Sequence, residues 1–149
     1  MDKGIYCLVF SNPGTACVVK RLGTVAFRGG WHIYVGSALG PGGLARVGRH
    51  FRLAREHAGK PVWHVDVLLL EPAFRLEYAL CGVTRQRLEC RLAAAIGGDM
   101  VPRFGCSDCR CPSHLFYRKE NPRNDIIAAF RDLGIECHEH NNEINGRQA

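Results

Sequence analysis

Five side chains of this sequence combine types and positions that could carry out acid–base and phosphate chemistry. They are two tyrosines in apolar runs, an arginine and a histidine one helical turn apart, and a glutamate beside an apolar helical stripe: Tyr6, Tyr34, Arg46, His50 and Glu89. Phenols and imidazoles can transfer protons, a guanidinium fork suits phosphate, and a carboxylate can bind Mg²⁺. Four of the five also have a structural interpretation, which is strand packing for the tyrosines, a solvated helix face for the arginine and an ion-paired surface position for the glutamate.

Sequence patterns in the first quarter of the chain predict the strands that carry both tyrosines. IYCLVF at 5–10 alternates with period two, and SNPG at 11–14 is a turn. ACVVKRLGTVAF at 16–27 supplies one or two further strands broken at Gly23, and WHIYVG at 31–36 follows. We therefore expect an antiparallel meander in this region.

A helix is predicted after the glycine-rich break at 40–43. Apolar residues recur there at helical spacing: Leu44, Val47, Phe51 and Ala54. At about 100° per residue, Arg46 and His50 lie on one flank of this stripe. Both side chains can therefore share a rim with the sheet.

The second half of the chain mixes strand-like and helical patterns. VWHVDVLLL at 62–70 alternates, so we expect a strand with His64 and Asp66 on one face, either facing the site or forming a structural hydrogen-bonded pair. AFRLEYAL at 73–80 is its expected partner strand. Two helices are predicted, one at 85–96 with Leu88, Leu92, Ala95 and Ile96 inward, and one at 124–134 capped by Asn124; the polar tail from Glu136 is expected to fray.

These patterns predict an α+β fold, an α/β sandwich in which helices flank a central antiparallel sheet and an extra N-terminal hairpin is added. A chain of 149 residues with 46% hydrophobic content can bury a substantial core. We expect residues 1–117 to form the main domain and residues 118–149 to form a C-terminal helix with a polar tail. The chain shows no run of about 18 apolar residues and no leader pattern, which predicts a soluble, cytoplasmic protein without a membrane partner.

The positive charge of the chain is concentrated in its main body. The net charge is +6, and residues 1–117 carry 15 Lys and Arg against 8 Asp and Glu, whereas residues 118–149 carry 5 against 6. A basic body favours polyanionic partners such as nucleic acids.

The eight cysteines are not expected to form a disulfide framework, because no secretory leader accompanies them. Cys7, Cys17, Cys81 and Cys90 occur in apolar surroundings, where a thiol behaves as a small hydrophobic group. Four residues in CSDCRCPSH could instead close a structural Zn²⁺ shell from one loop: Cys106, Cys109, Cys111 and His114. Reduced thiols that pack within this loop are the alternative.

The order of these motifs resembles the GIY-YIG nuclease superfamily. GIY occupies 4–6, YVG occupies 34–36 and continues as YVGSA, R-x-x-R-H-F follows at 46–51, and Glu89 lies on a later helix. WHVDVLL, Glu89-Cys90 and FGCSDCRCPSHLFY are similar to one archaeal and bacterial branch, whose domain is in some proteins fused to an endonuclease III-type DNA glycosylase. The resemblance covers about residues 3–117. Two departures are the long interval between the tripeptides, which must hold the extra hairpin, and the lack of a match to the late asparagine of homing endonucleases.

The resemblance implies phosphodiester hydrolysis on one surface of the sheet. Glu89 would bind Mg²⁺ or Mn²⁺, Arg46 would hold the scissile phosphate, and Tyr34 would position the water or the phosphate. Either Tyr6 or His50 would take the proton. Further substrate contacts are expected from residues near the motifs and in the late loop: Gly36, which would leave room for a phosphate, Ser37, Arg49, His64, Asp108 and His114.

Two functions follow from this sequence. The first is a metal-dependent DNA endonuclease acting in DNA repair or processing. The alternative is a non-catalytic nucleic-acid-binding module that presents DNA to a partner, such as a DNA glycosylase or another repair protein. Loss of cleavage without loss of binding in a Glu89 variant would separate the two.

Overall fold

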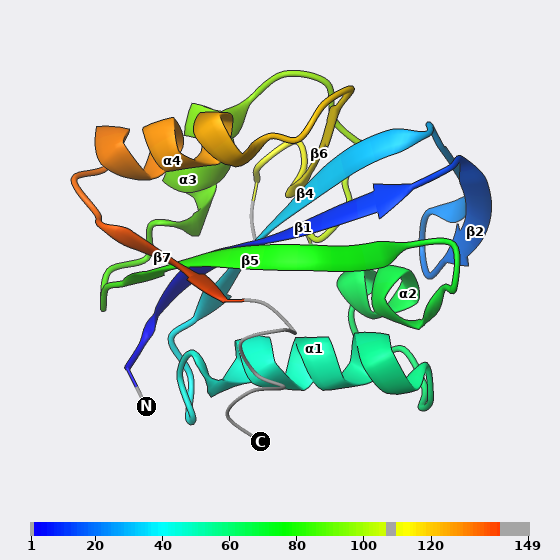
Figure 1. Ribbon diagram of the computed structural model, residues 1–149, viewed down its shortest axis with the longest axis horizontal. Coiled ribbons are helices and arrows are strands. Elements are labelled where there is room, and N and C mark those ends of the chain that lie inside the picture. The colour runs from blue at the N-terminus through cyan, green and yellow to red at the C-terminus, as the bar shows by residue number, and fades with distance from the viewer. Residues whose placement is uncertain (1, 107–109, 141–149) are drawn as a thin grey trace.

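The computed structural model of the chain describes residues 2–106 and 110–140 (Figure 1). Its strands and helices follow one another as β1 (Gly4–Asn12), β2 (Thr15–Val19), β3 (Gly23–Phe27), β4 (Gly30–Ala38), α1 (Ala45–Glu56), α2 (His64–Leu70), β5 (Arg75–Val83), α3 (Glu89–Ile96), β6 (Leu115–Arg118), α4 (Arg123–Asp132) and β7 (Cys137–His140).

A five-stranded antiparallel sheet forms the centre of the fold. Its strand order is β6-β4-β1-β5-β7, so β1 lies in the middle and pairs with both β4 and β5. Figure 1 shows α1 and α2 on one side of this sheet and α3 and α4 on the other. The predicted α+β fold with a central antiparallel sheet is confirmed.

The extra hairpin is also confirmed, but the predicted meander is wrong. β2 and β3 pair with each other in a separate two-stranded sheet, whereas β1 pairs with β4 along its whole length, from Gly4 opposite Ala38 to Asn12 opposite Gly30. Because this edge of β1 is already filled, the intervening hairpin must leave the plane of the central sheet.

The two faces of the sheet carry separate hydrophobic clusters. Alternation along β1 directs Leu8 and Phe10 into one cluster and Ile5, Cys7 and Val9 into the other. The first cluster also receives side chains from α1, α2 and the hairpin, including Phe51, Leu68 and Phe27. The second receives side chains from α3 and α4, including Leu92, Ile126 and Phe130. The C-terminal helix therefore packs on the same sheet as the preceding residues.

The predicted strand at 62–70 is wrong, because this segment forms α2. The Asp66 carboxylate accepts hydrogen bonds from the backbone N–H groups of Val62 and Trp63, at 2.8 and 3.1 Å, and so caps the helix. Val65, Leu68 and Leu69 are buried at the spacing of one helix face. The strand β5 pairs with β1 and β7 instead of this segment.

Three smaller predictions in the second half of the chain are also wrong. Asn124 lies inside α4, whose N-cap position is Pro122. In α3, Ala93 is buried whereas Ala95 is exposed. Residues Cys137–His140, expected in a frayed tail, form an edge strand on β5, because backbone groups alone can satisfy a free sheet edge.

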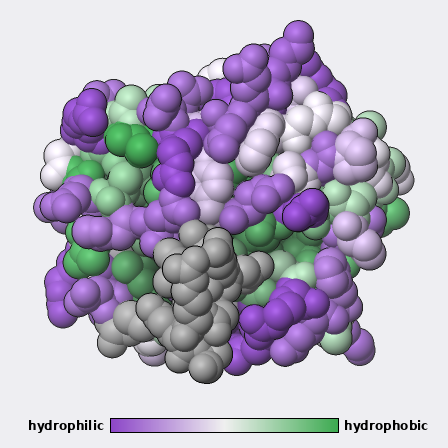
Figure 2. Space-filling view, in the orientation of Figure 1, coloured by the Kyte–Doolittle hydropathy of each residue, from purple (hydrophilic) through white to green (hydrophobic). Residues whose placement is uncertain are grey.

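The described part of the chain holds no helix that is both long and apolar enough to cross a membrane. Hydrophilic residues dominate the face seen in Figure 2, with smaller hydrophobic patches between them.

Candidate active site

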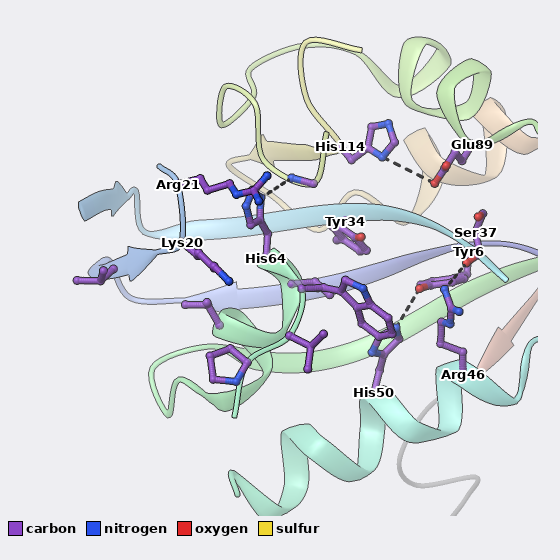
Figure 3. A pocket seen from close by; sticks show the side chains of 17 residues that line it. Tyr6, Lys20, Arg21, Tyr34, Ser37, Arg46, His50, His64, Glu89 and His114 are labelled. Carbon is purple, nitrogen blue, oxygen red and sulfur yellow. Dashed lines mark hydrogen bonds and ion pairs between the residues drawn. The ribbon is translucent and has the colours of Figure 1, made fainter. Parts of the chain in front are cut away.

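One cavity of about 570 Å³ collects most of the side chains that the sequence singled out. Those that line it come from β1, β4, α1, α2, α3 and the loop before β6: Tyr6, Tyr34, Ser37, Arg46, His50, His64, Glu89 and His114 (Figure 3). All five residues proposed from their chemistry are therefore brought together.

Tyr6 and His50 form a buried hydrogen-bonded pair between β1 and α1. The Tyr6 hydroxyl lies 2.9 Å from His50 Nε2, and each side chain is almost wholly buried. Burial raises the pKa of Tyr6 above its usual value of about 10, although Arg46 partly offsets this, and burial lowers the pKa of His50 to about 4. At neutral pH the pair is thus a phenol and an uncharged imidazole.

Two contacts orient Arg46. Its Nη1 atom donates to the backbone carbonyl of Ser37 at 3.0 Å, and its guanidinium lies 5.1 Å from the centre of the Trp63 ring. Ser37 therefore contributes a carbonyl that positions the arginine. The cation–π contact leaves the edge of the guanidinium able to donate to an anion.

Gly36 provides space for Tyr6. The two residues are opposite each other on β4 and β1, and a Cβ atom at Gly36 would lie only 2.5 Å from Tyr6 Cζ. The tyrosine ring therefore occupies the space that the sequence analysis assigned to a phosphate. Tyr34, two residues earlier on the same strand face, packs edge-on against Phe104, and burial raises its pKa well above 10.

Glu89 reaches the cavity from α3, on the other side of the sheet. Strand β6 pairs with Trp31–Tyr34 of β4, and Ser37, which lies beyond this pairing on β4, lines the cavity together with Glu89. The Glu89 side chain is about one-third exposed, with Oε2 3.8 Å from Nδ1 of the buried His114. Burial lowers the pKa of His114.

Other predicted residues take different positions. Arg49 does not line the cavity, but its guanidinium lies 5.1 Å from the Trp63 ring. His64 Nδ1 accepts a hydrogen bond from the Gly105 N–H at 2.8 Å, while Asp66 caps α2, so they do not form the expected strand-face pair. Asp108 and Cys109 lie outside the described residues.

Among the lining residues that were not predicted as site residues, three are charged or aromatic, namely Lys20, Arg21 and Trp63. The two basic residues occupy the turn between β2 and β3, and Trp63 precedes α2 with 43% of its surface exposed. Basic residues at a hairpin turn carry no signal in a single sequence, because such residues are common in solvated turns.

The charges that line the cavity favour an anion. Lys20, Arg21 and Arg46 contribute positive charge, and Glu89 is the one carboxylate among the described lining residues. A single partly exposed carboxylate fits Mg²⁺, which keeps several water ligands and binds phosphate oxygens as well. These lining charges are the kind that a phosphate group and a hydrated divalent cation would require.

A second group of potential metal ligands lies next to Glu89. Within the part of the chain that the structure describes, Cys90, Cys111 and His114 bring their ligand atoms within 4.8 Å of one another and could hold a metal ion. Cys111 and His114 belong to the predicted zinc set, whereas Cys90 was interpreted as a small hydrophobic residue. Cys106 of that set donates from Sγ to the carbonyl of Phe104 at 3.4 Å.

Comparison with known proteins identifies one family. A protein-family model described as "Domain of unknown function DUF123" matches residues 5–135. No curated protein and no solved structure matches the chain.

Proposed function

The chain belongs to the DUF123 family, and we propose that it is a divalent-metal-dependent endonuclease of the GIY-YIG type that hydrolyses phosphodiester bonds in DNA. The observation that carries this proposal is the meeting of Tyr6, Tyr34, Arg46, His50 and Glu89 in one cavity, although they come from four different elements. Proton-transfer groups, a phosphate-binding cation and a metal-binding carboxylate are the parts that phosphodiester hydrolysis requires.

Arg46 holds the scissile phosphate. A guanidinium has five N–H donors in a rigid fork, and the Ser37 carbonyl takes one of them. Because Ser37 and Trp63 restrain the group, little side-chain freedom remains to be lost when it binds two phosphate oxygens. Lys20 and Arg21, at the other end of the cavity, can neutralise neighbouring phosphates of the same strand.

Glu89 holds Mg²⁺ or Mn²⁺ through the part of its carboxylate that remains exposed. The ion, when bound, neutralises charge that develops on the phosphate during hydrolysis.

Tyr6 and His50 accept the proton of the attacking water. Burial keeps Tyr6 protonated and His50 uncharged, so the phenol can pass its own proton to Nε2 while it takes one from water. The water oxygen bonds to phosphorus, the bond from phosphorus to the leaving oxygen breaks, and that oxygen takes up a proton from solvent. This relay requires the tautomer with hydrogen on Nδ1, an atom that is buried without a partner among the described residues.

A cleavage assay with matched variants tests the proposal. Wild-type protein, Glu89→Gln and the exposed control Glu120→Gln are incubated with single-stranded, duplex, flap and branched DNA in Mg²⁺ or Mn²⁺. We expect metal-dependent cleavage by the wild type and the control, and a loss of at least about 100-fold in Glu89→Gln. If the wild type leaves every substrate intact in both metals, the nuclease proposal fails.

A binding module remains the second candidate function, and the cationic cavity with its exposed tryptophan favours it. Lys20, Arg21 and Arg46 with Trp63 could bind a nucleic-acid strand by charge and base stacking alone. In that case Glu89→Gln would bind DNA as tightly as the wild type, affinity would fall steeply with salt, and neither protein would cut.

A further inference from the structure

Cys90, Cys111 and His114 bring together three strong metal ligands from separate parts of the fold. Cys90 lies in the first turn of α3, Cys111 lies in the loop before β6, and His114 immediately precedes β6. Both cysteines are half-buried, and the His114 side chain is only 3% exposed. The group is thus partly shielded from solvent.

The spacing of these atoms fits a tetrahedral ion. Zn–S bonds of about 2.3 Å and Zn–N bonds of about 2.0 Å place neighbouring ligand atoms about 3.5–3.8 Å apart. Cys90 Sγ lies 3.7 Å from His114 Nε2, and the whole group falls within 4.8 Å. Small side-chain adjustments therefore suffice to complete the coordination distances.

The ligand types select the kind of metal. Two thiolates and an imidazole favour zinc over the hard cations Mg²⁺ and Ca²⁺, which prefer oxygen ligands. We propose that Cys90, Cys111 and His114 bind a Zn²⁺ ion at the junction of α3 with the loop before β6. This ligand set differs from the single-loop set predicted from the sequence, because it requires Cys90 from the helix.

The backbone and the second ring nitrogen of His114 support this site. The His114 N–H donates to the Phe104 carbonyl at 2.9 Å, and the His114 carbonyl accepts from the Val35 N–H at 2.9 Å. With Nε2 directed toward Cys90, Nδ1 lies 3.8 Å from the Glu89 carboxylate. Histidine ligands of zinc commonly direct their other nitrogen to a carboxylate, which holds the ring in position.

The ion connects this site to Glu89. Because Cys90 follows Glu89 directly in the chain, zinc would hold the first turn of α3 against the loop and restrict where the Glu89 carboxylate can lie. This positioning of Glu89 rests on the proposed nuclease function, whereas zinc binding itself does not.

Metal analysis of the full chain tests the site. Protein purified in buffer without chelators should carry about one zinc ion per chain by atomic emission. Loss of a residue that only supports a metal ligand lowers metal affinity by about 10–100-fold. Cys90→Ser and Cys111→Ser each remove a ligand itself, so each should lower zinc affinity by more than this. The control Cys137→Ser, a half-buried thiol on β7, should keep its zinc.

Cobalt substitution gives a second measurement that does not depend on catalysis. Wild-type protein reconstituted with Co²⁺ should show a thiolate-to-cobalt charge-transfer band, and this band should weaken in Cys90→Ser while circular dichroism stays unchanged. Glu89→Gln, which the nuclease proposal expects to be inactive, should keep the band. Wild-type protein that binds no zinc, or Cys90→Ser protein with wild-type zinc affinity, would overturn the proposed site.

Discussion

Replacing Gly36 by alanine tests whether the close contact between β4 and the Tyr6 ring organises the site. The new Cβ atom would lie 2.5, 2.6 and 2.8 Å from Cζ, Oη and Cε1 of Tyr6, so the buried ring must move by about 1 Å to reach ordinary contact. Overpacking of this kind costs about 1–3 kcal/mol, and loss of the Tyr6–His50 hydrogen bond adds about 0.5–1.5 kcal/mol. We expect Gly36→Ala to lower the free energy of unfolding by about 2–4 kcal/mol.

Urea unfolding followed by circular dichroism measures this change, and Gly48→Ala is the matched control. Gly48 lies in α1, and a Cβ atom there would meet nothing within 4 Å. Alanine should therefore stabilise the helix by about 0.5–1 kcal/mol. The same substitution is thus expected to change stability in opposite directions at the two positions.

Equal stability of Gly36→Ala and wild type would refute the close approach of Tyr6 to β4. A Gly36→Ala protein that loses stability but cleaves DNA at the wild-type rate would instead show that cleavage does not depend on the position of the Tyr6 ring.

Three further predictions concern the site. Because the unfolded chain binds a proton on His50 between pH about 6.5 and about 4 while the folded chain does not, stability should fall as the pH drops through this range, by up to about 3 kcal/mol. The buried His32, whose pKa is also lowered to about 4, adds to this dependence of stability on pH. The free energy of unfolding, measured by chemical denaturation at a series of pH values, should therefore change less steeply with pH in His50→Gln than in the wild type. Equal slopes in the two proteins would contradict the shifted pKa of His50. Tyr6→Phe and His50→Gln should each slow cleavage by about 10²–10⁴-fold, and the double variant should be no slower than the worse single variant, whereas additive losses would exclude a shared proton path. Arg46→Lys should slow cleavage about tenfold or more in single-turnover assays, while the exposed Arg52→Lys should have no effect; equal activity of both variants would remove the need for a guanidinium at the phosphate.

Short-range sequence patterns were sufficient to predict those parts of the site that depend on a single strand or helix. Period-two alternation identified the strand of Tyr6, an apolar run that ends at a glycine identified the strand of Tyr34, and helical spacing placed Arg46 and His50 on one flank of α1. The interval between the two tripeptides is longer than in the homing endonucleases of the superfamily that the sequence resembles, and this difference implied the additional hairpin, which is present as β2 and β3.

The same patterns failed where a short apolar run fits two periods. Residues 62–70 alternate like a strand, but Val65, Leu68 and Leu69 also satisfy helical spacing, and the Asp66 cap favours the helix. The edge strand β7 could not be predicted from side chains, because its stability comes from backbone pairing with β5.

The sequence by itself determined the local geometry of each chemical group: which strand carries a tyrosine, which face of α1 carries the arginine and histidine, and that Glu89 lies on a helix beside its apolar stripe. Tertiary structure alone decided the long-range neighbours, because these depend on how the elements pack across the sheet. It placed the Tyr6 ring over Gly36, brought Lys20 and Arg21 of the hairpin turn to the cavity, and set Cys90 of α3 beside Cys111 and His114. The thiol of Cys90 looks like an ordinary core residue in the sequence, and only the approach of the loop before β6 places it among metal ligands.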